Sequence, residues 1–241
     1  MKLLSLDSSG LVASVAVLED DNLLAEYTVN YKKTHSQTLL PMLDTVSKMI
    51  ELDLNTVDAI AIASGPGSFT GLRIGSATAK GLGLALDIPI VEVPTVDALA
   101  YNLFDTDKLV CPIMDARRSQ VYTGLYHFED HKLVVCESQM AISVNDLAEK
   151  LNNRGEEVIF FGDGVSVYRA LLDELLTVSH SYAPAHVNKQ RAAAVGALGA
   201  IYFSDGKIVN ADDHQPEYLR KSQAEREREE ALQKKSQEEQ A

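Results

Sequence analysis

The sequence predicts an α/β protein of two similar lobes, each with a mixed sheet flanked by helices. Three observations lead to this prediction: one order of elements occurs twice, the first strand of each half ends in an aspartate, and 46% of the 241 residues are hydrophobic. That length and apolar content suffice for one large domain or two small ones. We assign residues 1–105 to the first lobe, 106–222 to the second, and 223–241 to a charged tail.

The first half begins with three short apolar segments separated by polar turns, which is typical of an antiparallel meander. A stripe of apolar residues between Leu39 and Ile50 then predicts a helix. A buried strand, a second helix from about Thr70, a further strand and a short helix follow. The ranges expected for the strands and the last helix are 3–6, 14–18, 23–29, 58–63, 88–93 and 96–104.

The second half repeats this order, with elements expected at 109–115, 120–128, 133–142, 145–153, 157–161, 167–176 and 189–203. The repetition predicts two lobes of one architecture. Asp7 and Asp115 end the first strand of each lobe, and a cleft is expected between the lobes. This is the layout of the ribonuclease H-like fold of actin, Hsp70 and the sugar kinases, a likeness that concerns the fold and not the reaction.

Charge and composition argue against several functional classes. A net charge of −13 and a pI near 4.8 oppose strong binding of nucleic acid by this chain alone. No apolar run approaches the roughly 20 residues of a membrane span, and we see no signal peptide, so a cytoplasmic protein is expected. Cys111 and Cys136 lie in strand-like runs and are expected to be buried, reduced thiols. The tail is rich in Glu, Arg, Lys and Gln, and is expected to be partly helical or disordered.

The most distinctive stretch runs over residues 64–83. Gly65, Pro66 and Gly67 break the chain after the buried strand, and a helix begins soon afterwards. Each glycine inside a helix costs roughly 0.8–1 kcal/mol relative to alanine, which close approach of another backbone would offset. The small residues that recur every four positions, and so line one side of this helix, are Gly71, Gly75, Ala79 and Gly83.

Two interpretations of this stretch stay open. The turn could bind phosphate at the helix N-terminus, although neither the Walker nor the dinucleotide-binding spacing is present. Alternatively, the smooth side of the helix packs inside the domain or against a partner.

Few residues have a pattern that predicts chemistry. Asp7 and Asp115 could hold Mg²⁺ or orient water in a phosphotransferase, or could simply cap turns. His127 and His131 are four residues apart, but the hairpin expected between them lacks the helical geometry of a metal-binding pair. His35 stands at a helix start with no partner that the spacing can place, and no nucleophile elbow occurs. We therefore predict neither a catalytic residue nor a metal site.

These motifs together point to a known family. Residues 64–75, which read Ser-Gly-Pro-Gly-Ser-Phe-Thr-Gly-Leu-Arg-Ile-Gly, and residues 79–82, Ala-Lys-Gly-Leu, closely resemble the bacterial TsaB (YeaZ) family of tRNA threonylcarbamoyladenosine biosynthesis proteins. Residues 6–9, 35–41, 114–122 and 216–221 also stand where that family has its motifs. The resemblance covers about residues 1–224 and leaves the charged tail outside.

The resemblance implies a non-catalytic accessory subunit. Proteins of this family pair with a catalytic paralogue, TsaD, which holds the metal and transfers the threonylcarbamoyl group to the adenosine beside the anticodon in tRNAs reading codons that begin with A. An ATPase, TsaE, joins the assembly, and a separate enzyme makes the threonylcarbamoyl-adenylate. No cofactor of its own is therefore expected on this chain: ATP or ADP and the metal are expected on the partner subunits, and tRNA only within the complex. The paralogue's H-x-x-x-H helix motif has no counterpart in the first half of this sequence.

The resemblance also implies pairing through the helices of the first lobe. The predicted interface residues are Leu39, Leu40, Leu43, Gly71, Arg73, Gly75, Ala79 and Gly83. An exposed row of small residues would favour a homodimer when the partner is absent. Vestigial nucleotide or phosphate contacts would be made by Asp7, Gly65, Gly67, Ser68 and Asp115. The alternatives are an active nucleotide-binding phosphotransferase or ATPase of the same fold and, with less support, a peptidase.

Overall fold

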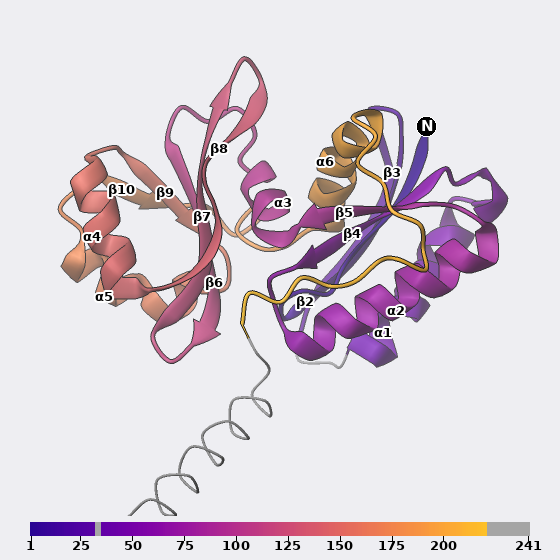
Figure 1. Cartoon of the computed structure of the whole chain (residues 1–241), viewed down its shortest axis with the longest axis horizontal. Helices are drawn as coiled ribbons and strands as arrows, with labels where there is room; N and C mark the ends of the chain where they lie inside the picture. Colours follow the sequence, from indigo (N-terminus) through magenta and orange to yellow (C-terminus); the bar gives the residue numbers. More distant parts are fainter. Residues whose placement is uncertain (32–34, 221–241) are drawn as a thin grey trace, which may run out of the picture.

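The computed structural model describes residues 1–31 and 35–220, and these form two lobes side by side (Figure 1). Each lobe contains a five-stranded sheet, with order β3-β2-β1-β4-β5 in the first lobe and β10-β9-β6-β7-β8 in the second. Both sheets are mixed, because each combines an antiparallel three-stranded meander with parallel strands. The predicted fold class is confirmed. The tail at 223–241 lies outside the described residues.

The first half of the chain follows the predicted order, and its strands alternate with helices after the meander. Its elements are β1 (Lys2–Asp7), β2 (Val12–Glu19), β3 (Asn22–Asn30), α1 (His35–Met49), the short 3₁₀ helix η1 (Leu54–Thr56), β4 (Ala59–Gly65), α2 (Phe69–Leu86), β5 (Ile90–Pro94) and α3 (Thr95–Tyr101).

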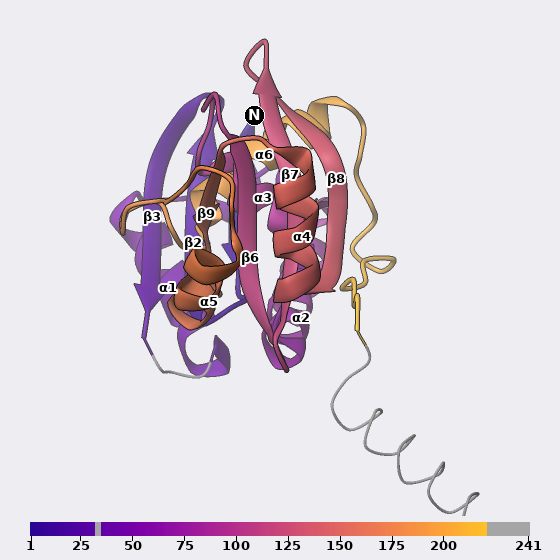
Figure 2. The same ribbon diagram turned by 90° about the vertical axis from the view of Figure 1, so that its left-hand side faces the viewer.

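The second half repeats that order of elements. Figure 2 shows the face on which α4 and α5 lie over the second sheet. Its elements are β6 (Leu109–Arg117), β7 (Gln120–Glu129), β8 (Lys132–Ser143), α4 (Val144–Arg154), β9 (Val158–Phe161), α5 (Val165–Leu175), β10 (His180–Tyr182) and α6 (Ala192–Ser204). The short β10, which pairs with β9, was not predicted from the sequence.

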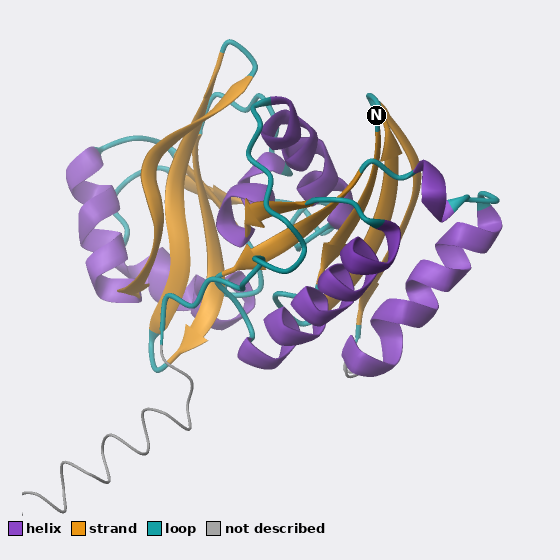
Figure 3. Ribbon diagram, turned by 45° about the vertical axis from the view of Figure 1, so that its right-hand side comes forward, coloured by secondary structure: helices purple, strands orange, loops and turns teal. Residues whose placement is uncertain are grey.

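Helices cover both faces of each sheet. In the first lobe, α1 and α2 lie side by side on the outer face (Figure 3), where apolar side chains of β1, β2 and β4 meet Leu39, Leu43 and Val46 of α1. In the second lobe, α4 and α5 cover the outer face and share a core with β6, β7 and β9. Each lobe is therefore a three-layered α/β/α unit, with α3 and α6 as the inner layers.

The two inner helices are exchanged between the halves of the chain. Helix α6, which comes from the second half, packs its small residues against the first sheet, with Val195 and Leu198 among strands β1, β4 and β5. Helix α3, which comes from the first half, places Val96 and Leu99 in a core with β6 and β7. A boundary at residue 105 thus separates the strands of the two sheets but not the helices that cover them.

The final described segment, residues 207–220, returns across the first lobe and ends at the second. Val209 pairs with Ile90 at the edge of the first sheet, and the segment then passes along α2 toward β6 (Figure 1). Cys111 is buried and Cys136 is half-buried, and both are free thiols, so only the first matches the expected burial. Within the described residues, no helix is long and apolar enough to cross a membrane.

Candidate functional site

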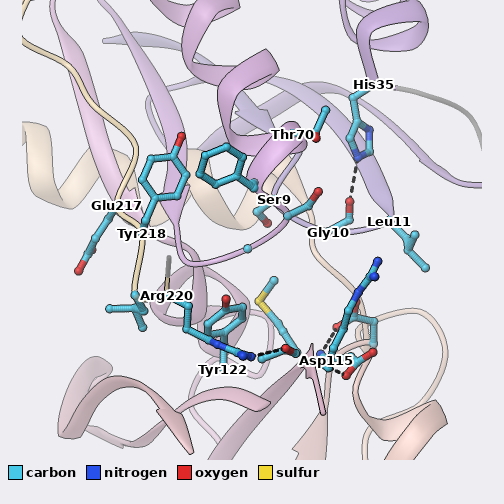
Figure 4. A pocket seen from close by; sticks show the side chains of 18 residues that line it. Ser9, Gly10, Leu11, His35, Thr70, Asp115, Tyr122, Glu217, Tyr218 and Arg220 are labelled. Carbon is cyan, nitrogen blue, oxygen red and sulfur yellow. Dashed lines mark hydrogen bonds between the residues drawn. The ribbon is translucent and has the colours of Figure 1, made fainter. Parts of the chain in front are cut away.

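The candidate site is a cleft of about 710 Å³ between the lobes, at the ends of β1 and β6. It is bordered by the turn after β1, the N-terminus of α2, the turn after β6, the loop after β9 and the final segment of the chain (Figure 4). The lining residues are Ser9, Gly10, Leu11, His35, Gly67, Ser68, Phe69, Thr70, Met114, Asp115, Ala116, Arg117, Tyr122, Asp163, Glu217, Tyr218, Leu219 and Arg220.

On the first-lobe side, Asp7 ends β1 as predicted but does not line the cleft. Its side chain is only 1% exposed, and its Oδ1 accepts hydrogen bonds from the Ser9 amide at 2.9 Å and the Ser9 hydroxyl at 2.7 Å. Burial raises the pKa of this carboxyl to about 6, although the bonds from Ser9 favour the charged form. Asp7 therefore shapes the turn from beneath, and the prediction of a cleft contact at this position is wrong.

The predicted turn before α2 is present, and its residues divide into two groups. Gly67 and Ser68 line the cleft, whereas Gly65 is buried under the backbone of Glu217. Ser68 caps the helix, because its hydroxyl accepts a 3.3 Å bond from the Gly71 amide. The Ser68 amide donates to the Ser9 carbonyl at 2.6 Å, so the turn is already bonded to the neighbouring turn of the first lobe.

On the second-lobe side, Asp115 lines the cleft and holds the turn after β6. Its Oδ1 accepts from the Arg117 amide at 2.8 Å and from the Tyr168 hydroxyl at 2.9 Å. Arg117 and the two residues after it, Arg118 and Ser119, all have positive φ. Such a run is unfavourable for side chains larger than glycine, so the Asp115 bonds help to keep this turn in place.

A second carboxylate, Asp163, lies beside Asp115 after β9. Its Oδ1 accepts from the Asp115 amide at 3.3 Å, and burial raises its pKa, which the nearby Asp115 charge raises further. Across the described residues, no three His, Cys, Asp or Glu side chains are grouped in a way that could hold a metal ion.

The row of small residues on α2 faces inward and packs inside the domain, which is one of the arrangements left open by the sequence. The expectation that this row is exposed for pairing is wrong. A Cβ atom on Gly71 would overlap the Ser8 carbonyl, one on Gly75 would meet the Ser8 hydroxyl, and one on Gly83 would meet Ala211. Ala79 is also fully buried. The close backbone approach that these glycines allow takes place inside the chain, between α2, the turn after β1 and the final segment.

The predicted stripe on α1 is also mostly internal. Leu39 and Leu43 are buried in the core of the first lobe, whereas Leu40 is 55% exposed. On α2 the exposed residues lie on the opposite side from the glycine row, and Leu84 among them is 54% exposed. The others on this side are Thr70, Arg73, Ala77, Gly81 and Ala85.

The histidines hold structural contacts. The Nε2 of His35 donates to the Gly10 carbonyl at 2.8 Å, and His127 and His131 contact Glu156 and Asp105 at 2.6 and 2.8 Å. The predicted hairpin is present, with His127 in β7 and His131 in the turn between β7 and β8, and the two side chains contact different carboxylates.

Sequence reasoning missed the contribution of the final segment to the cleft. The Tyr218 ring packs on Phe69 with centroids 4.6 Å apart, and Arg220 donates to the Ala116 carbonyl in the second lobe. Figure 4 shows Glu217, Tyr218 and Arg220 along one wall. The motif at 216–221 was visible in the sequence, but no local pattern says that it folds back across both lobes.

Comparisons with known proteins show which proteins this chain resembles in sequence and fold. The family model of TsaD, tRNA N6-adenosine threonylcarbamoyltransferase, matches residues 22–228. The tRNA threonylcarbamoyladenosine biosynthesis protein TsaB of Bacillus subtilis is 32% identical over 225 residues, which cover 93% of this chain and 96% of that protein. TsaB of Haemophilus influenzae is 37% identical over 237 residues, with 91% and 94% covered. The solved structure of YeaZ from Pseudomonas aeruginosa has a TM-score of 0.78 and 27% identity, and 90% of this chain and 99% of that chain are covered.

Proposed function

This chain belongs to the TsaB family of tRNA threonylcarbamoyladenosine biosynthesis proteins, and we propose that it serves there as a non-catalytic accessory subunit. In this role it pairs with a TsaD-type catalytic paralogue and activates it. The reaction is transfer of the threonylcarbamoyl group to the adenosine next to the anticodon in tRNAs reading codons that begin with A. A TsaE-type ATPase joins the assembly, in the cytoplasm.

The position of Asp7 is the observation that supports a non-catalytic role. In an active phosphotransferase of this fold, a carboxylate at this strand end would have to reach a metal ion or a water in the cleft. Here the Asp7 carboxylate is turned into the lobe and bonded twice to Ser9. This arrangement favours an accessory subunit over the phosphotransferase alternative, with nucleotide and metal bound by the partner subunits and tRNA bound only in the complex.

The exposed sides of α1 and α2 are the surface that we propose for the partner. The glycine row and the Leu39–Leu43 stripe are used inside the lobe, so the surface available to a partner includes Leu40, Arg73, Ala77, Gly81 and Leu84. The small side chains at positions 77 and 81 still allow a partner helix to approach closely. Leu40 and Leu84 supply apolar area, which also supports self-association when the partner is absent.

Reconstituted modification of tRNA tests the role. Purified TsaD-type transferase, adenylate synthase and TsaE-type ATPase are assayed with and without this protein, and with this protein alone. We expect product only when it is present together with the transferase. Equal product without it would contradict the accessory role, and product from this protein alone would show catalysis.

A substitution on the exposed side of α2 tests the surface. Leu84→Arg places a charge on an apolar residue of the proposed contact and should weaken binding to the TsaD-type transferase at least tenfold in a titration. Leu23→Arg is the matched control, because Leu23 is 42% exposed on β3, away from α2. Both variants should keep the wild-type melting temperature. Equal affinity of the Leu84 variant and wild type would exclude this surface.

A further inference from the structure

The final segment has a firmly anchored part and a part that is held by fewer contacts. Up to His214 it is anchored: this side chain is 1% exposed, its Nδ1 donates to Glu92 at 2.6 Å, and its Nε2 lies 2.9 Å from the Ser76 hydroxyl. Lys80 of α2 donates to the carbonyls of Asp212 and His214 at 2.9 and 3.1 Å. Burial and these hydrogen bonds, two of them from the Lys80 ammonium group, keep the anchor in place.

Beyond the anchor, we name residues 215–220 the clasp, and its residues 217–220 line one wall of the cleft. The Glu217 amide donates to the Ser64 carbonyl at 2.7 Å, and its carboxylate accepts from Gln139 of the second lobe at 2.7 Å. Arg220 donates to the Ala116 carbonyl. Unlike His214, both Glu217 and Tyr218 are exposed, so the clasp is held by few surface contacts. Local opening of such a segment costs less free energy than global unfolding.

The contact that links the clasp to α2 is a stack of three side chains. The Arg73 guanidinium lies 4.0 Å from the centroid of the Phe69 ring, and the Tyr218 ring packs on the same Phe69. The Arg73 Nε also donates to the Tyr218 hydroxyl, at 3.3 Å. Arg73 is exposed on the side of α2 that we propose for the partner, whereas Tyr218 lines the cleft.

We propose that Arg73 couples the partner surface to the cleft: a partner carboxylate that binds Arg73 takes it from Tyr218, and the clasp opens. A bond from guanidinium to carboxylate pairs two opposite charges, whereas the bond to the neutral Tyr218 hydroxyl has a charge on the donor only, so the exchange is favourable. The loss of the hydrogen bond and of the Arg73 guanidinium from the stack leaves the clasp with the Tyr218–Phe69 ring contact and the Gln215 amide bond to Glu92. The backbone bond at Glu217 and the bonds of Gln139 and Arg220 also remain. This coupling rests on the proposed pairing through α2, and it adds that pairing exposes the cleft wall.

Hydrogen–deuterium exchange of the full chain tests the coupling without the partner. Arg73→Ala should raise the exchange rate of amides 217–219 at least about fivefold, while amides 209–214 of the anchor keep their wild-type rate. Arg169→Ala is the matched control, since Arg169 lies 4.3 Å from the Tyr182 centroid in a similar stack on the second lobe. Tyr218→Phe, which keeps the ring and loses the hydroxyl, should give an intermediate rate. Unchanged exchange of 217–219 in Arg73→Ala would overturn the coupling.

Addition of the TsaD-type transferase separates this proposal from the proposed function. We expect slower exchange over residues 77–84, which reports pairing, together with faster exchange over 217–219. Pairing with unchanged or slower exchange in the clasp would overturn the coupling and leave the partner surface intact. If residues 77–84 are not protected, the proposed surface fails, and the comparison of Arg73→Ala with Arg169→Ala still decides whether Arg73 holds the clasp.

Discussion

Helices α2 and α5 follow equivalent strands in the two lobes, but they pack against their sheets in different ways. The inward side of α2 carries glycines and an alanine, so its backbone touches the Ser8 turn. The inward side of α5 carries Tyr168 and Leu172, which fill the space between helix and sheet. The comparison teaches that one order of elements tolerates two packing solutions, and that the first lobe uses backbone contact where the cleft and the final segment meet.

The turns after β1 and β6 differ in the same sense. Asp7 is buried and hydrogen-bonded to Ser9. Asp115, in contrast, faces the cleft and holds a turn with three consecutive residues of positive φ. The duplicated aspartates have therefore taken different roles. The first stabilises the turn that receives α2, and the second shapes a cleft wall.

The largest effect is expected from a substitution in the side chains that pack α5 against its sheet. Leu172 is fully buried, so Leu172→Ala should lower the free energy of unfolding by about 3 kcal/mol through lost apolar burial and a cavity. Urea unfolding at pH 7 measures the loss. Leu84→Ala, at an exposed position on α2, should change stability by less than about 0.5 kcal/mol. A cost below about 1 kcal/mol at Leu172 would mean that α5 does not depend on this side chain.

A smaller effect is expected from a substitution at the close backbone contact of α2. Gly71→Ala forces a methyl group into the Ser8 carbonyl and should cost about 2 kcal/mol of unfolding free energy, as overpacking does. Gly81→Ala is the control on the same helix: its Cβ would meet nothing within 4 Å, and it should stabilise the protein by up to about 1 kcal/mol. Equal effects of the two substitutions, measured by urea unfolding, would remove the distinction between the two sides of α2.

The smallest effect is expected in the pH dependence of stability, when substitutions of the two aspartates are compared. The folded-state pKa of Asp7 is raised to about 6, so its contribution to stability is greatest below the unfolded value and falls as the pH rises through 6. Asp7→Asn keeps an acceptor for Ser9 and removes this loss. Its gain in unfolding free energy over wild type should therefore be about 1 kcal/mol larger at pH 7.5 than at pH 5. Asp115→Asn, at the corresponding position of the second lobe, is measured at the same two pH values. A flat profile for Asp7→Asn would contradict the sealed position of Asp7.

The order of elements was predictable because hydrophobic periodicity and turn residues act locally. Those signals correctly placed Asp7 at the end of β1 and a hairpin turn after His127, whereas β6 continues two residues beyond Asp115 to Arg117. The inward side of α2 was not predictable in the same way, since small residues such as Ala77 and Gly81 also occupy its outward side. Nor was the wall formed by Tyr218, because it depends on a return of the chain to Phe69, almost 150 residues earlier.

Helices α3 and α6 each cover the sheet of the other half of the chain, and this arrangement bears on how such a chain could arise. Each half supplies the helix that covers the other half's sheet, so either half expressed alone would present an uncovered apolar face. If both halves descend from one duplicated unit, that ancestor had to associate with a copy of itself and trade its last helix. Gene fusion then made an obligatory association permanent. The two halves expressed as separate polypeptides should accordingly recover their solubility only when they are mixed.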